Sequence, residues 1–171
     1  MVKAYKTGMG VLRLLALGAV LAACQEVVYP VPSAEQVSDY YAATSGVSVS
    51  MEGSVAEVTV TQPSGQLRRG GSLWAKVGPY VFLFSDETRL LMEDHPGLSG
   101  VRVVTRSSRG DLVGSALLRN GSLSETQWRR ALSIAGKARL EGTQRPSLLE
   151  DLVRWGEDRS EFEYNPRYTR P

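Results

Sequence analysis

The chain has 171 residues, 42% of them hydrophobic, which is the composition of a folded domain with one modest core. Its 20 basic and 18 acidic side chains nearly balance, so nothing in the charge indicates nucleic-acid binding. The single cysteine, Cys24, excludes an internal disulfide, and the single histidine, His95, excludes the usual multi-histidine zinc sites. We therefore expect no metal and no other cofactor.

Residues 1–23 have the pattern of a secretory signal peptide. A basic segment with Lys3, Lys6 and Arg13 precedes an apolar run that ends in small residues before Cys24. This run has about ten residues, whereas a membrane-spanning helix needs about 20. We therefore expect removal of residues 1–23 and no permanent span. Without them, 17 basic residues face 18 acidic ones, and the net charge changes from +2 to −1.

The sequence LAAC at residues 21–24 resembles the lipobox of bacterial lipoproteins, and the resemblance covers residues 3–24. It implies cleavage between Ala23 and Cys24, a diacylglyceryl group on the Cys24 thiol, and a further acyl chain, such as palmitate, on its new amine. Two or more acyl chains hold a protein firmly on a bilayer, at ~0.8 kcal/mol per buried CH₂. Gln25 stands where an Asp would favour inner-membrane retention. In a host with two membranes, the resemblance therefore implies the periplasmic face of the outer membrane.

The segment that follows is predicted to be a tether and then a helix. Two prolines favour an extended backbone, so residues 24–32 are expected to form a lipidated tether. Ser33 with Gln36 three residues later matches a capping box, which predicts a helix over residues 33–44 that stops near Gly46.

The central third is predicted to be rich in strands. Alternating apolar residues on both sides of Gly53 predict a first hairpin. Two apolar segments that flank Gly78 predict a second hairpin, with residues 80–84 as a central strand covered on both faces. A third hairpin is expected around Arg109. Residues 86–97 leave two alternatives open, a short helix capped by the aspartate at position 86 or another strand.

The last third changes to a helical period. Residues 124–142 are predicted to form one helix, and a second begins near Pro146, with Ser147 as the start of a capping box. Strands followed by helices indicate an α+β fold. We expect a mostly antiparallel sheet of about five to seven strands, packed by one N-terminal and two C-terminal helices. Residues 33–160 would form this single domain, and residues 161–171 an extended C-terminal tail.

The densest set of groups suited to acid–base or metal chemistry lies in one short segment. It comprises Asp86, Glu87, Glu93, Asp94 and His95. The two carboxylate pairs would converge if the segment turned back on itself. The alternative is a solvated loop in which an aspartate caps a helix. No glycine-rich phosphate cradle or nucleophile elbow accompanies the set.

Two further surfaces allow more than one interpretation. The predicted helix at residues 124–142 has a basic face that either is simply solvated or meets anionic lipid headgroups; its cations are Arg129, Arg130, Lys137 and Arg139. The tail aromatics Phe162, Tyr164 and Tyr168 either dock on the domain's own sheet or stay mobile, or else add a strand to a partner.

These patterns lead us to expect a lipid-anchored envelope protein that acts by binding rather than catalysis. It would serve as a scaffold, assembly or accessory factor, with membrane lipid and possibly another envelope protein as partners and no nucleic acid. One alternative is an envelope hydrolase that uses the segment from Asp86 to His95. Another is a carrier of lipid or hydrophobic ligand, whose cavity would be lined by Trp74, Phe82 and Trp128.

Overall fold

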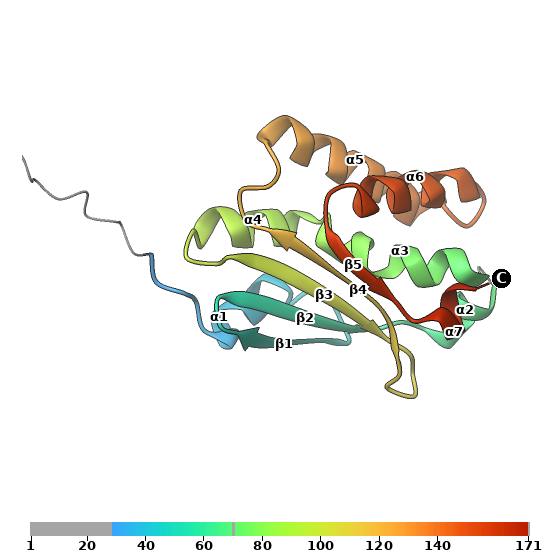
Figure 1. Ribbon diagram of the computed structural model, residues 1–171, viewed down its shortest axis with the longest axis horizontal. Coiled ribbons are helices and arrows are strands. Elements are labelled where there is room, and N and C mark those ends of the chain that lie inside the picture. The colour runs from blue at the N-terminus through green and yellow to red at the C-terminus, as the bar shows by residue number, and fades with distance from the viewer. Residues whose placement is uncertain (1–28, 70, 171) are drawn as a thin grey trace, which may run out of the picture.

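A computed structural model of the chain describes residues 29–69 and 71–170, which form one sheet packed by helices (Figure 1). The predicted cleavage and lipidation sites, Ala23 and Cys24, lie outside the described residues. The strands are β1 (Val47–Glu52), β2 (Val55–Thr61), β3 (Gly100–Arg106), β4 (Leu112–Arg119) and β5 (Glu161–Tyr164). The helices are α1 (Ala34–Tyr40), α2 (Ser64–Arg69), α3 (Gly71–Leu83), α4 (Asp86–Asp94), α5 (Glu125–Glu141), α6 (Pro146–Glu157) and α7 (Pro166–Thr169).

The five strands lie in the order β1-β2-β3-β4-β5, and every neighbouring pair is antiparallel except β2 and β3. The predicted α+β class and the mostly antiparallel sheet are confirmed, with five strands. The parallel pair needs a long crossover, which α2, α3 and α4 supply. Three helices therefore lie between the β1–β2 hairpin and the β3–β4 hairpin, and the sequence predicted strands over only one of them, α3.

The predicted second hairpin and its central strand at residues 80–84 are wrong. Residues 71–83 form one helix, α3, with Pro79 inside it. Gly78 permits close packing rather than a turn, since a Cβ there would lie 2.9 Å from Nε2 of Gln62. This Gln62 nitrogen donates to the Trp74 carbonyl at 2.7 Å. A continuous apolar run does not distinguish a buried strand from a buried helix.

The helix starts agree with the predictions in part. The capping boxes of α1, at Ser33, and α5, at Ser124, are both present. Residues 86–97, for which the sequence left a helix or a strand open, contain helix α4. Its N-cap is Ser85 rather than Asp86. The predicted capping box at Ser147 is wrong, because α6 begins one residue earlier, with Pro146 in its first turn and no side-chain cap. Proline is well suited to that position, since its missing N–H would be unpaired there in any case.

Helix α3 lies between two layers. It packs on β3 and β4 on one side and on α5 and α6 on the other, so α5 and α6 form an outer layer over α3 (Figure 1). A Cβ added at Gly156 of α6 would lie 2.4 Å from the Tyr80 ring of α3. Because a helix covered on both sides needs apolar residues all round, its sequence lacks the one-sided pattern of a surface helix.

The C-terminal segment differs from the extended tail that the sequence predicted. Strand β5 pairs with β4, with Tyr164 opposite Gly114, and α7 follows it. The Tyr164 hydroxyl lies 2.8 Å from the Tyr80 hydroxyl. Burial raises the pKa of Tyr80 to about 12. Strand β5 thus joins the domain's own sheet and Tyr164 contacts α3, whereas Phe162 is 45% exposed. None of the helices at residues 29–69 and 71–170 is long and apolar enough to cross a bilayer.

Candidate functional site

The acidic segment singled out in the sequence is divided between the two ends of α4. Asp86 and Glu87 lie in its first turn, whereas Glu93, Asp94 and His95 lie at its far end. Seven residues of helix place Asp86 and Glu93 about 10 Å apart along the axis. Between them, Arg89 lies 3.5 Å from the Asp86 carboxylate and 2.9 Å from that of Glu93. No group of three or more metal-ligating side chains occurs in the described part of the chain.

The far end of α4 has a structural contact with α1. The Tyr40 hydroxyl donates to Oδ2 of Asp94 at 2.8 Å and lies 3.3 Å from Nε2 of His95. Partial burial raises the pKa of Tyr40, and the Asp94 carboxylate raises it further. This arrangement joins two helices at the surface.

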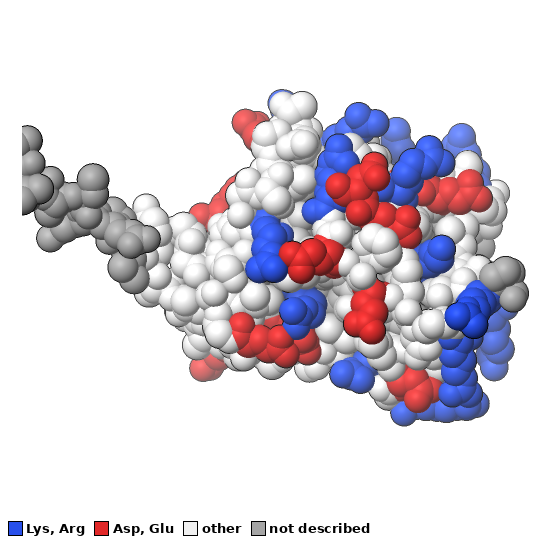
Figure 2. All heavy atoms as spheres, viewed as in Figure 1, with Lys and Arg blue, Asp and Glu red and all other residues white. Residues whose placement is uncertain are grey.

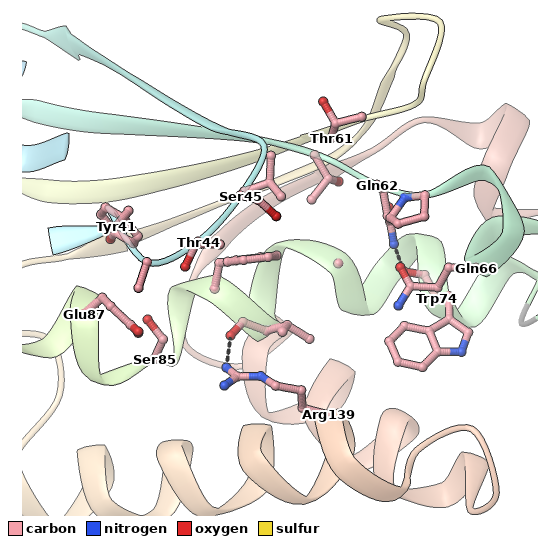
Figure 3. A pocket seen from close by; sticks show the side chains of 17 residues that line it. Tyr41, Thr44, Ser45, Thr61, Gln62, Gln66, Trp74, Ser85, Glu87 and Arg139 are labelled. Atoms are coloured by element: carbon pink, nitrogen blue, oxygen red, sulfur yellow. Dashed lines mark hydrogen bonds between the residues drawn. The ribbon is translucent and has the colours of Figure 1, made fainter. Parts of the chain in front are cut away.

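A trough of about 510 Å³ runs along one flank of α3 (Figure 3). Its walls come from the turn after α1, the end of β2, the start of α4 and Arg139 of α5. We call this hollow the α3 trough. Its volume falls within the range of small-molecule sites.

The walls of the α3 trough are largely apolar. Trp74, Val81 and Phe82 line it from α3, and Val60 lines it from β2. The carrier hypothesis required a cavity lined by Trp74, Phe82 and Trp128. Two of these three side chains line the trough, whereas Trp128 is only 8% exposed and belongs to the core beneath α5.

Two polar side chains, Arg139 in the trough wall and the buried Thr88, hold the last turn of α3. Nη2 of Arg139 donates to the Val81 carbonyl at 2.9 Å, and Oγ1 of Thr88 donates to the Phe82 carbonyl at 2.8 Å. The final carbonyls of a helix have no partner within the helix, so these side chains satisfy them. The Tyr41 hydroxyl lies 2.8 Å from that of Thr88, and burial raises the pKa of Tyr41.

Gln62 lies at the end of the trough near Trp74 (Figure 3). Its side chain is 4% exposed, and Nε2 donates to the Trp74 carbonyl. Its Oε1 is buried and has no hydrogen-bond partner among residues 29–69 and 71–170. Unpaired buried oxygens are uncommon in folded proteins. The Gln62 amide is therefore the least satisfied polar group beside the trough.

A second hollow of about 610 Å³ continues from the first. The two share Pro63, Gln66, Trp74 and Arg139, and Leu73 and Leu149 line the second one. The sequence does not reveal either hollow, because both border helix α3, whose apolar run predicts a hairpin. The apolar run around Trp74 was the available signal, but its spacing did not identify a helix flank.

The basic face of α5 is exposed, as both interpretations of the sequence require. Figure 2 shows Lys and Arg side chains over α5 and α6, with Asp and Glu side chains among them. Arg130 of α5 lies 4.9 Å from the centre of the Trp155 ring of α6, and Arg159 lies 3.9 Å from it. Part of this basic surface therefore packs on aromatic surface of the protein itself.

Comparisons with known proteins assign no family to the chain. No protein-family model, no curated protein and no solved structure matches it.

Proposed function

We propose that this chain is a lipid-anchored cell-envelope protein that acts by binding, as a scaffold, assembly or accessory factor for another envelope component. The α3 trough is the observation that carries the proposal. Its apolar stretch around Trp74 and Phe82, with polar side chains about it, fits a binding site for a molecule with both apolar and polar parts. The bound group is either an apolar segment of a partner or a hydrophobic small molecule.

The N-terminal sequence supports the location in this proposal. Acyl chains on Cys24 would hold the chain to a bilayer, at the periplasmic face of the outer membrane in a host with two membranes. From Cys24 to Tyr29 an extended backbone reaches about 17 Å. Pro30 packs closely on Gly97, which follows α4. A Cβ added at Gly97 would lie 2.4 Å from the carbonyl oxygen of Pro30. The end of the domain that carries residues 29–32, opposite the C-terminus in Figure 1, would thus stay near the lipid.

A carrier of hydrophobic ligands is the second candidate, and the two predicted aromatic side chains in the trough favour it. An envelope hydrolase has less support. Its proposed acid–base groups, from Asp86 to His95, are distributed over both ends of α4, and the trough contains only Glu87 of that set.

Crosslinking in native membranes tests the binding proposal. The wild type is compared with Cys24→Ala, which removes the anchor, and with Ala43→Trp, which places a large side chain at the trough wall. Ala42→Trp is the matched control, because Ala42 is also exposed but does not line the trough. We expect the wild type and the control to capture the same envelope component, and both other variants to lose it. Equal capture by all four forms would contradict the proposal.

A further inference from the structure

We infer that the α3 trough binds a single-chain amphiphile with a carboxylate headgroup, such as a fatty acid. The headgroup would pair with Arg139, and the hydrocarbon chain would run along α3 towards Trp74. This inference rests on the proposed binding function and names the ligand of the same site.

The shape of the trough indicates one extended chain. Its α3 lining runs from Trp74 to Phe82, which is about 12 Å of helix axis. The turn at residues 43–45 bounds it on one side and Arg139 bounds it on the other (Figure 3). A hollow that is long and bounded on both sides accommodates a single hydrocarbon chain better than a broad ring system.

The charges of the lining indicate a headgroup with one negative charge. Arg139 forms no ion pair with another described residue. Arg139 is exposed, and its bond to the Val81 carbonyl orients the guanidinium and uses one donor, which leaves others for a ligand. A guanidinium pairs readily with both oxygens of a carboxylate. Glu87, the other charged side chain of the lining, disfavours a second negative charge.

The second hollow gives a longer chain further room. It shares Trp74 and Arg139 with the first hollow, and its walls include Leu73 and Leu149. A chain that starts at Arg139 would therefore meet the Trp74 ring and then Leu73 and Leu149, with Gln66 beside it. Each buried CH₂ contributes about 0.8 kcal/mol to transfer from water, so affinity should rise with chain length.

Photocrosslinking of the lipid-anchored full chain in phosphatidylcholine vesicles tests this inference. The probes are lauric acid with a terminal diazirine and the alcohol with the same chain and diazirine. We expect the acid to label peptides that contain residues 73–82 or 149. Ala43→Trp should lower this labelling about tenfold, whereas Ala42→Trp should leave it unchanged.

A charge variant separates the headgroup from the chain. Arg139→Gln should lower labelling by the acid about tenfold and leave labelling by the alcohol unchanged. Lys137→Gln, on the same helix but outside the trough, is the matched control. Equal labelling by the two probes, or labelling insensitive to Ala43→Trp, would overturn the inference. If the acid failed to label the trough while Ala43→Trp still lost its crosslinked envelope component, the ligand would be wrong and the proposed binding function would stand.

Discussion

Replacing Gly156 with alanine is expected to destabilise the protein by about 1–3 kcal/mol, because overpacking a filled interface forces side chains and backbone to shift. The new Cβ would lie 2.4 Å from two carbons of the Tyr80 ring. That ring is fully buried, and its hydroxyl is hydrogen-bonded to Tyr164 of β5 at 2.8 Å. The ring therefore has little freedom to move, and α6 has to shift away from α3.

Urea unfolding of the wild type and Gly156→Ala measures this effect. Gly136→Ala in α5 is the matched control, since a Cβ there meets nothing within 4 Å. Alanine in place of glycine within a helix should stabilise that control by roughly 0.5–1 kcal/mol. A Gly156→Ala protein as stable as the wild type would contradict the close packing of α6 on α3.

Replacing Thr88 with valine is the second large expected effect. The change removes the hydroxyl that donates to the Phe82 carbonyl and meets the Tyr41 hydroxyl. Tyr41 is 3% exposed, so water cannot easily replace the lost partner. A buried polar group left unpaired costs about 1–3 kcal/mol, and this change affects two such groups.

A double-mutant cycle measured by urea unfolding checks this result. In a Tyr41→Phe background, Thr88→Val should cost less, because one of the two groups is already absent. Thr126→Val, at an exposed position of α5, should change the free energy of unfolding by less than about 0.5 kcal/mol. A Thr88→Val cost equal in both backgrounds would show that the Tyr41–Thr88 hydrogen bond contributes nothing to stability.

Local signals predicted the parts of the fold that local interactions determine. The capping boxes at Ser33 and Ser124 mark the starts of α1 and α5, because the side chain and the helix amide it binds are three residues apart. The turns near Gly53 and Arg109 join strands that pair with their neighbours in sequence. In each case the partners lie close together in the chain.

Features that depend on distant contacts could not be predicted in this way. The apolar run of α3 is covered by the sheet on one side and by α5 and α6 on the other, which its sequence does not reveal. The parallel pairing of β2 with β3 depends on the crossover through α3. The α3 trough follows from the same helix. The sequence therefore suggested Trp74 and Phe82 as cavity residues, without the position of the cavity or the part that Arg139 has in it.

The intact mass of the protein from its native membranes tests the central claim most directly. A lipid-anchored binding protein should begin at Cys24 and carry the added mass of a diacylglyceryl group and one amide-linked acyl chain. A mature chain that begins at another residue, or that has an unmodified Cys24, would contradict the lipid-anchored account.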